Sequence, residues 1–71
     1  MATLRINNNH YLASNARSAG YTDTSGDLHD MQTEAMEIIE RFEGSTDNGQ
    51  FPDGSYWYGD EYNPMVIVKV A

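Results

Sequence analysis

Three acidic side chains recur at helical spacing near the middle of the chain and carry its clearest chemical signal. Asp30, Glu34 and Glu37 would stand about 6 and 4.5 Å apart along the axis of an α-helix. Successive phosphates on a nucleic-acid strand carry one charge each at roughly 6–7 Å. A stripe of carboxylates with this spacing can occupy the Lys and Arg side chains that normally hold a phosphate backbone.

The same stripe is also compatible with a solvated helix face. Like charges three or four residues apart on a helix repel by about 0.2–0.5 kcal/mol, and solubilising faces usually intersperse both signs. Here no Lys lies among the acidic residues, and only Glu37 and Arg41 form an i,i+4 pair of the favourable orientation, worth about 0.3 kcal/mol. The repulsion indicates either added solubility or a partner that neutralises it.

Five aromatic residues gather between positions 51 and 62, interleaved with acidic ones. In a strand, Tyr56 and Tyr58 share one face and Trp57 takes the other. We expect Trp57 to face the core, which would leave the two tyrosines exposed. Tyrosine beside carboxylate is typical of protein-binding hot spots, and cross-strand packing in a small sheet is the alternative.

Catalytic and metal-binding motifs are weak by comparison. His10 and His29 are the side chains that titrate near neutrality, and neither belongs to a nucleophile motif. The segment from Asp23 to Glu34 places oxygen ligands at positions 1, 3, 5 and 12 of an EF-hand count, but the required Gly at position 6 is Leu28. The loop 44–54 holds Asx and Gly residues that could ligate a cation, although turn chemistry explains them better. We therefore expect no catalytic residue, no metal and no cofactor.

Composition narrows the classes of function further. The chain has 71 residues, no cysteine and a net charge of -7, which predicts one domain over 1–71 without disulfides or zinc. The acidity argues against direct nucleic-acid binding and against anionic membranes, because both need Lys and Arg. All eleven acidic residues lie between Asp23 and Glu61, where Arg41 is the only cation, so this segment carries -10 and the flanks +3. The absence of a signal-like or long apolar segment predicts a soluble, cytoplasmic protein.

The elements that would position these residues follow from periodicity and from turn residues. We predict strands over 3–6, 55–58 and 65–70 and helices over 10–19 and 27–43, with loops over 21–26 and 44–54. The last strand is apolar on both faces, which places it in the middle of a sheet beside the first strand. The predicted fold is α+β, in the order β-α-α-β-β, with a short antiparallel sheet packed by one long amphipathic helix.

In size, acidity and lack of cysteine, the chain resembles small acidic phage-encoded inhibitors, namely anti-CRISPR proteins and DNA mimics. The resemblance implies a non-enzymatic inhibitor, acting in the cytoplasm of a bacterial host, that binds a basic nucleic-acid channel of a CRISPR-Cas effector and blocks access to it. We expect a monomer or weak dimer that binds neither nucleic acid nor membrane directly. The alternative is a structural or interaction module, such as a phage accessory or self-associating protein, that works through the aromatic hairpin. The predicted partner-binding residues, taken from the charge map and the aromatic pattern, are Asp23, Asp27, Asp30, Glu34, Glu37, Glu40, Tyr56, Tyr58, Asp60 and Glu61.

Overall fold

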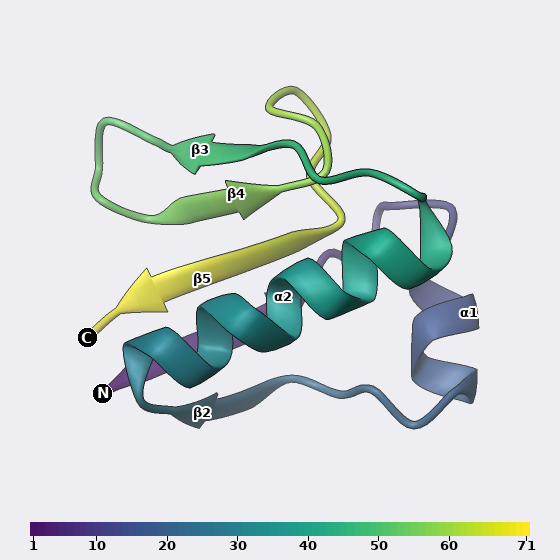
Figure 1. Ribbon diagram of the computed structural model, residues 1–71, viewed down its shortest axis with the longest axis horizontal. Coiled ribbons are helices and arrows are strands. Elements are labelled where there is room, and N and C mark those ends of the chain that lie inside the picture. Colours follow the sequence, from purple (N-terminus) through teal and green to yellow (C-terminus); the bar gives the residue numbers. More distant parts are fainter.

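A computed structural model describes residues 1–71 and shows an α+β fold in which one helix packs across a single antiparallel sheet (Figure 1). The strands are β1 (Ala2–Ile6), β2 (Thr24–Gly26), β3 (Asn48–Gln50), β4 (Tyr56–Tyr58) and β5 (Val66–Val70). The helices are α1 (Ala13–Ser18) and α2 (Leu28–Phe42). The predicted fold class is confirmed, and the predicted strands and helices occur in the predicted order.

The five strands run in the order β2-β1-β5-β4-β3, and every neighbouring pair is antiparallel. The last strand, β5, therefore lies in the middle of the sheet with β1 beside it, as its apolar sequence predicts. Arg5, Ile67 and Trp57 lie directly opposite one another on β1, β5 and β4. This register places every second residue of three neighbouring strands on the same face.

The edge strands β2 and β3 lie in segments that were predicted to be loops. Each has only three residues, which are polar or Gly and show no apolar alternation. They form because they pair with β1 and β4, whose own sequences favour strands. In β3, Gly49 lies opposite Trp57, and a Cβ at Gly49 would come within 2.7 Å of the indole ring. The ring therefore lies across the backbone of β3, and the glycine makes this arrangement possible.

The core forms between α2 and the face of the sheet that carries Leu4, Ile6, Val66 and Val68. Its buried hydrophobic residues are Ala2, Leu4, Ile6, Ala13, Ala16, Met31, Ala35, Ile38, Ile39, Tyr58, Met65, Val66 and Val68. The helix contributes members at the spacing its sequence predicts. Fully burying an aliphatic side chain contributes about 1.5–3 kcal/mol, so this layer provides much of the stability that such a small domain can gain.

The ends of α2 follow the local rules of helix capping. The carboxylate of Asp27 accepts a hydrogen bond from the backbone N–H of His29 at 3.2 Å. At the other end Gly44 has a φ of 65°, a left-handed conformation that glycine adopts without a steric cost. Asp27 therefore caps the start of α2, and Gly44 follows its end.

The first helix is shorter than predicted and begins differently. Residues 10–12 form a turn before α1, and no side chain caps the helix itself. Asn7 accepts from the N–H of Asn9 within the preceding turn, at 3.1 Å, and does not cap α1. Gly20, with a φ of 102°, lies just after the helix.

Neither helix is long and apolar enough to span a lipid bilayer.

Candidate binding surface

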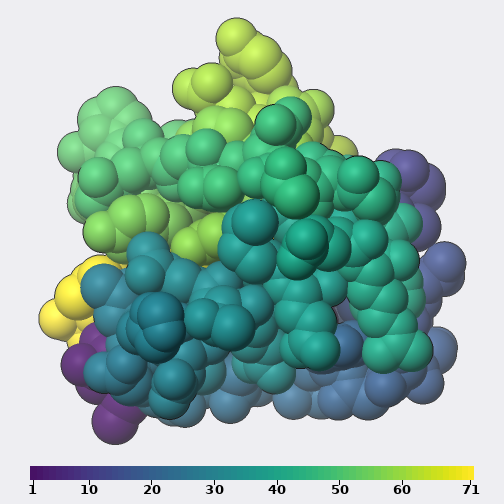
Figure 2. Space-filling model, viewed as in Figure 1, coloured from purple at the N-terminus to yellow at the C-terminus, as the bar shows by residue number.

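The outward face of α2 is an acidic surface. Asp30, Glu37 and Glu40 are exposed, and Glu34 is half-buried. We call these four residues the acidic α2 face. The opposite side of the helix is fixed in the core, so the backbone holds these carboxylates at constant spacing. Figure 2 shows α2 running across the front of the molecule, where a shallow depression is lined by Thr33, Met36, Glu37, Glu40 and Arg41.

No cation forms an ion pair with the acidic α2 face, although Arg41 lines the same depression as Glu37 and Glu40. The structure has one ion pair, Arg17–Asp23, and a close contact between His10 and Glu43, and neither includes a residue of this face. The predicted pair between Glu37 and Arg41 does not form. Arg41 turns instead toward Tyr21, donating to its hydroxyl at 3.3 Å, and its guanidinium lies 5.6 Å and 5.4 Å from the ring centroids of Tyr21 and Phe42. A cation over two aromatic rings gains more than an exposed i,i+4 pair does.

The predicted acidic residues outside α2 do not join this face in one cluster. Asp23 accepts hydrogen bonds from the N–H of Ile6 at 2.9 Å and from Arg17 at 3.1 Å, so its charge is used inside the fold. Asp60 accepts from the N–H of Tyr62 at 3.1 Å and shapes the loop that connects β4 to β5. That loop and the segment of Asp23 lie on opposite sides of α2 (Figure 1). Glu61 is exposed in the same loop as Asp60.

The predicted orientation of the aromatic strand is wrong. Tyr58 faces the core and is only 3% exposed, Tyr56 is half-buried beside it, and Trp57 points to the opposite face of the sheet. Burial raises the pKa of the Tyr58 hydroxyl above its ordinary value. The prediction placed the largest ring in the core. It failed because the space beside Gly49 takes the indole on the other face, while the tyrosines meet α2. Tyr58 cannot contact a partner without leaving the core.

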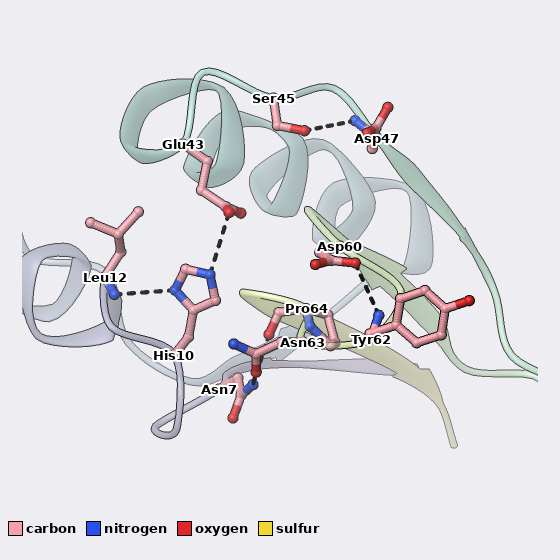
Figure 3. Close-up of polar contacts among 10 residues, drawn as sticks. All are labelled: Asn7, His10, Leu12, Glu43, Ser45, Asp47, Asp60, Tyr62, Asn63 and Pro64. Atoms are coloured by element: carbon pink, nitrogen blue, oxygen red, sulfur yellow. Dashed lines mark hydrogen bonds and ion pairs between the residues drawn. The ribbon is translucent and has the colours of Figure 1, made fainter.

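A buried polar contact that the sequence did not reveal joins the turn before α1 to the end of α2 (Figure 3). His10 Nε2 lies 3.3 Å from Glu43 Oε2, and His10 Nδ1 accepts from the N–H of Leu12 at 3.1 Å. An Nδ1 that accepts must be unprotonated, so Nε2 carries the proton and donates it to the carboxylate. Both nitrogens are occupied and the His10 side chain is 3% exposed. The pair therefore ties the turn before α1 to the end of α2, while the second carboxylate oxygen, Glu43 Oε1, is buried without a hydrogen-bond partner.

Asp53 and Ser55 form a tight turn directly before β4. The Asp53 carboxylate accepts from the Ser55 hydroxyl at 2.6 Å and from the Ser55 N–H at 2.9 Å. These hydrogen bonds, the hydroxyl first, lower the pKa of Asp53, and the positive charge of Lys69 adds to the effect. Asp53 in the loop 44–54 therefore stabilises a turn, which is the role that the sequence favours for the Asx residues of this loop.

The structure brings no three His, Asp or Glu side chains close enough together to hold a metal ion. The EF-hand spacing falls on α2, which begins at Leu28, so the ligand positions that follow are helical. Comparisons with protein-family models, with curated proteins and with solved structures find no match to this chain. Function is therefore inferred from the fold and its surface charges.

Proposed function

We propose that this protein is a non-enzymatic inhibitor whose acidic α2 face binds a basic nucleic-acid-binding surface of another protein and blocks access to it. A CRISPR-Cas effector in a bacterial cytoplasm, the partner implied by the resemblance to anti-CRISPR proteins, is the first candidate. The observation that carries the proposal is that Asp30, Glu34, Glu37 and Glu40 share one helix face and no cation of the chain pairs with them.

The mechanism is competition for Lys and Arg side chains. A basic channel attracts the carboxylates over a distance of about 8–10 Å at physiological salt, which speeds the encounter. Once bound, each carboxylate takes a position that a phosphate would hold. The core fixes α2 and Asp27 caps it, so the backbone that carries the charges is already ordered before binding and little backbone entropy is lost.

The alternative, a module that works through Tyr56 and Tyr58, has less support. One of these rings is buried and the other half-buried. The exposed tyrosines of the chain are Tyr11, at 79%, and Tyr62, at 93%, and neither belongs to the predicted hairpin strands. We therefore do not propose the hairpin as the working surface.

A competition assay tests the proposal. Purified CRISPR effectors are loaded with labelled nucleic acid in the presence of the protein, and displacement is measured at rising salt. We expect inhibition that weakens steeply with salt, and that is lost when Glu37→Gln and Glu40→Gln are combined.

The matched control changes the net charge equally at another place. Thr46→Lys with Gln50→Lys also raises the net charge by two, at exposed positions in and beside β3. We expect this variant to inhibit nearly as well as the wild type. If both double variants lost inhibition equally, inhibition would depend on the net charge of the protein and not on the acidic α2 face. Inhibition indifferent to salt and to Glu37 and Glu40 would overturn the proposal.

A further inference from the structure

The face of the sheet that points away from α2 differs in charge from the rest of this acidic molecule. Alternation along β1 and β5 places Thr3, Arg5, Ile67 and Lys69 on this face. Thr3, Arg5 and Lys69 are exposed and Ile67 is half-buried. The four side chains line a shallow hollow, which we call the basic sheet face, and Trp57 lies beside it on β4.

This face holds the cations that the fold itself does not use. Of the four Lys and Arg residues, Arg17 is paired with Asp23 and Arg41 lies over two aromatic rings. Arg5 and Lys69 have no ion pair. Asp53 attracts Lys69 from one side, but not within ion-pair distance. Two cations are therefore free on the layer opposite the acidic α2 face.

Their spacing suits two carboxylates on a helix. Arg5 lies opposite Ile67, and Lys69 is two residues further along β5, so the two cations are diagonal neighbours about 7–8 Å apart, and somewhat closer at their Cβ atoms. Carboxylates three or four residues apart on a helix have Cβ atoms about 5–6 Å apart, a difference that the flexible Lys and Arg side chains can absorb. Glu34 and Glu37 are such a pair.

We propose that the basic sheet face binds a second copy of this chain through that copy's acidic α2 face. Pairing either face with its own kind would bring like charges together, so only the head-to-tail arrangement is complementary. A contact of this type joins different surfaces on the two copies and can repeat, giving short open chains. Each contact would cover one acidic α2 face and make it unavailable to another partner.

The net charge of -7 sets the conditions under which such chains form. At about 0.01 M salt the screening length is about 30 Å, longer than the 27 Å extent of the molecule, so whole molecules repel. At about 0.1 M it is about 10 Å, which removes that repulsion but leaves close pairs attractive, and at about 1 M close pairs are screened too. Association is therefore greatest at intermediate salt.

Sedimentation velocity at these three salt concentrations tests the proposal, with protein at about 0.1–1 mM because two charge pairs give weak association. We expect the weight-average mass to exceed the monomer mass at intermediate salt and to approach it at both extremes. Arg5→Glu with Lys69→Glu, and separately Glu34→Lys with Glu37→Lys, should each be monomeric. An equimolar mixture of the two variants should associate again, because each then presents faces complementary to the other.

Circular dichroism melting establishes that both variants fold, and Arg5→Gln with Lys69→Gln provides a milder version of the first. A monomeric wild type at every salt concentration would overturn the proposal, as would association that survives all three variants. Quenching of Trp57 fluorescence by a single-stranded oligonucleotide, without self-association, would assign the face to nucleic acid instead. The sheet variants leave the acidic α2 face intact, so their inhibition of a partner tests the proposed function separately.

Discussion

His10 Nε2 donates a hydrogen bond to Glu43 Oε2 across 3.3 Å and so ties the turn before α1 to the residue that follows α2. His10→Ala would leave the Glu43 carboxylate and the Leu12 N–H without their partner. A buried polar group left unpaired costs about 1–3 kcal/mol, and more if it is charged. We expect a loss of that size in urea denaturation. Glu43→Gln keeps an acceptor oxygen for the His10 Nε2–H, so it should lower the free energy of unfolding less than His10→Ala does. Equal losses from the two substitutions would contradict the assignment of His10 Nε2 as the donor.

The backbone at Gly59 passes close to the carboxylate of Glu43. A Cβ at Gly59 would overlap Oε1 of Glu43, and its φ of 110° is unfavourable for any other residue. Gly59→Ala should therefore lower the free energy of unfolding by at least about 1–3 kcal/mol. In a Glu43→Ala background the overlap is absent, so the loss that Gly59→Ala causes relative to Glu43→Ala alone reports the backbone strain. If Gly59→Ala lowers the free energy of unfolding equally with Glu43 and with Ala at position 43, the overlap contributes nothing.

Gly49 has the same relationship to Trp57 on the other face of the sheet. Gly49→Ala would place a methyl group 2.7 Å from the indole ring and force it off β3. We expect a shift in Trp57 fluorescence together with a loss of about 1–3 kcal/mol, typical of overpacking. Trp57→Leu should make the same substitution tolerable, since the smaller side chain leaves the space open. An unchanged emission spectrum in Gly49→Ala would contradict the packing described here.

These glycine contacts illustrate what the sequence can and cannot predict. The amphipathic period of α2 and the apolar run of β5 place both elements correctly, because each pattern depends on the burial of the residue itself. The strand β3 and the orientation of Trp57 depend instead on what lies opposite, since Gly49 has no side chain to signal its partner. The His10–Glu43 pair joins residues far apart in sequence, for which no local pattern exists. The acidic α2 face was predicted because helical spacing alone defines it.

The buried hydroxyl of Tyr58 makes stability sensitive to alkaline pH. Burial raises its pKa in the folded protein above the ordinary value of 10.0. The folded state therefore keeps this proton at a pH where the unfolded chain loses it. This contribution to stability is fully present below about pH 10 and is lost as the pH rises through the folded pKa. Urea midpoints measured from pH 8 upward should fall more steeply for the wild type than for Tyr58→Phe. Parallel curves would contradict this assignment.

The acidic α2 face should impose a small stability cost that a single substitution can remove. Glu34 lies four residues after Asp30 and three before Glu37, so all three carboxylates repel one another. Glu34→Lys converts both repulsions into attractions, and each pair of this type is worth about 0.2–0.5 kcal/mol. We expect the variant to be slightly more stable in urea at low salt, with the gain lost at high salt, while its inhibition of a basic partner falls.

Glu34→Gln, which removes the charge without reversing it, should give about half of the gain in stability. Opposite effects on stability and on binding would indicate that the repulsion persists because a partner neutralises it. If Glu34→Lys raised stability and left inhibition unchanged, the acidic face would be a solubilising surface and the proposed function would fail.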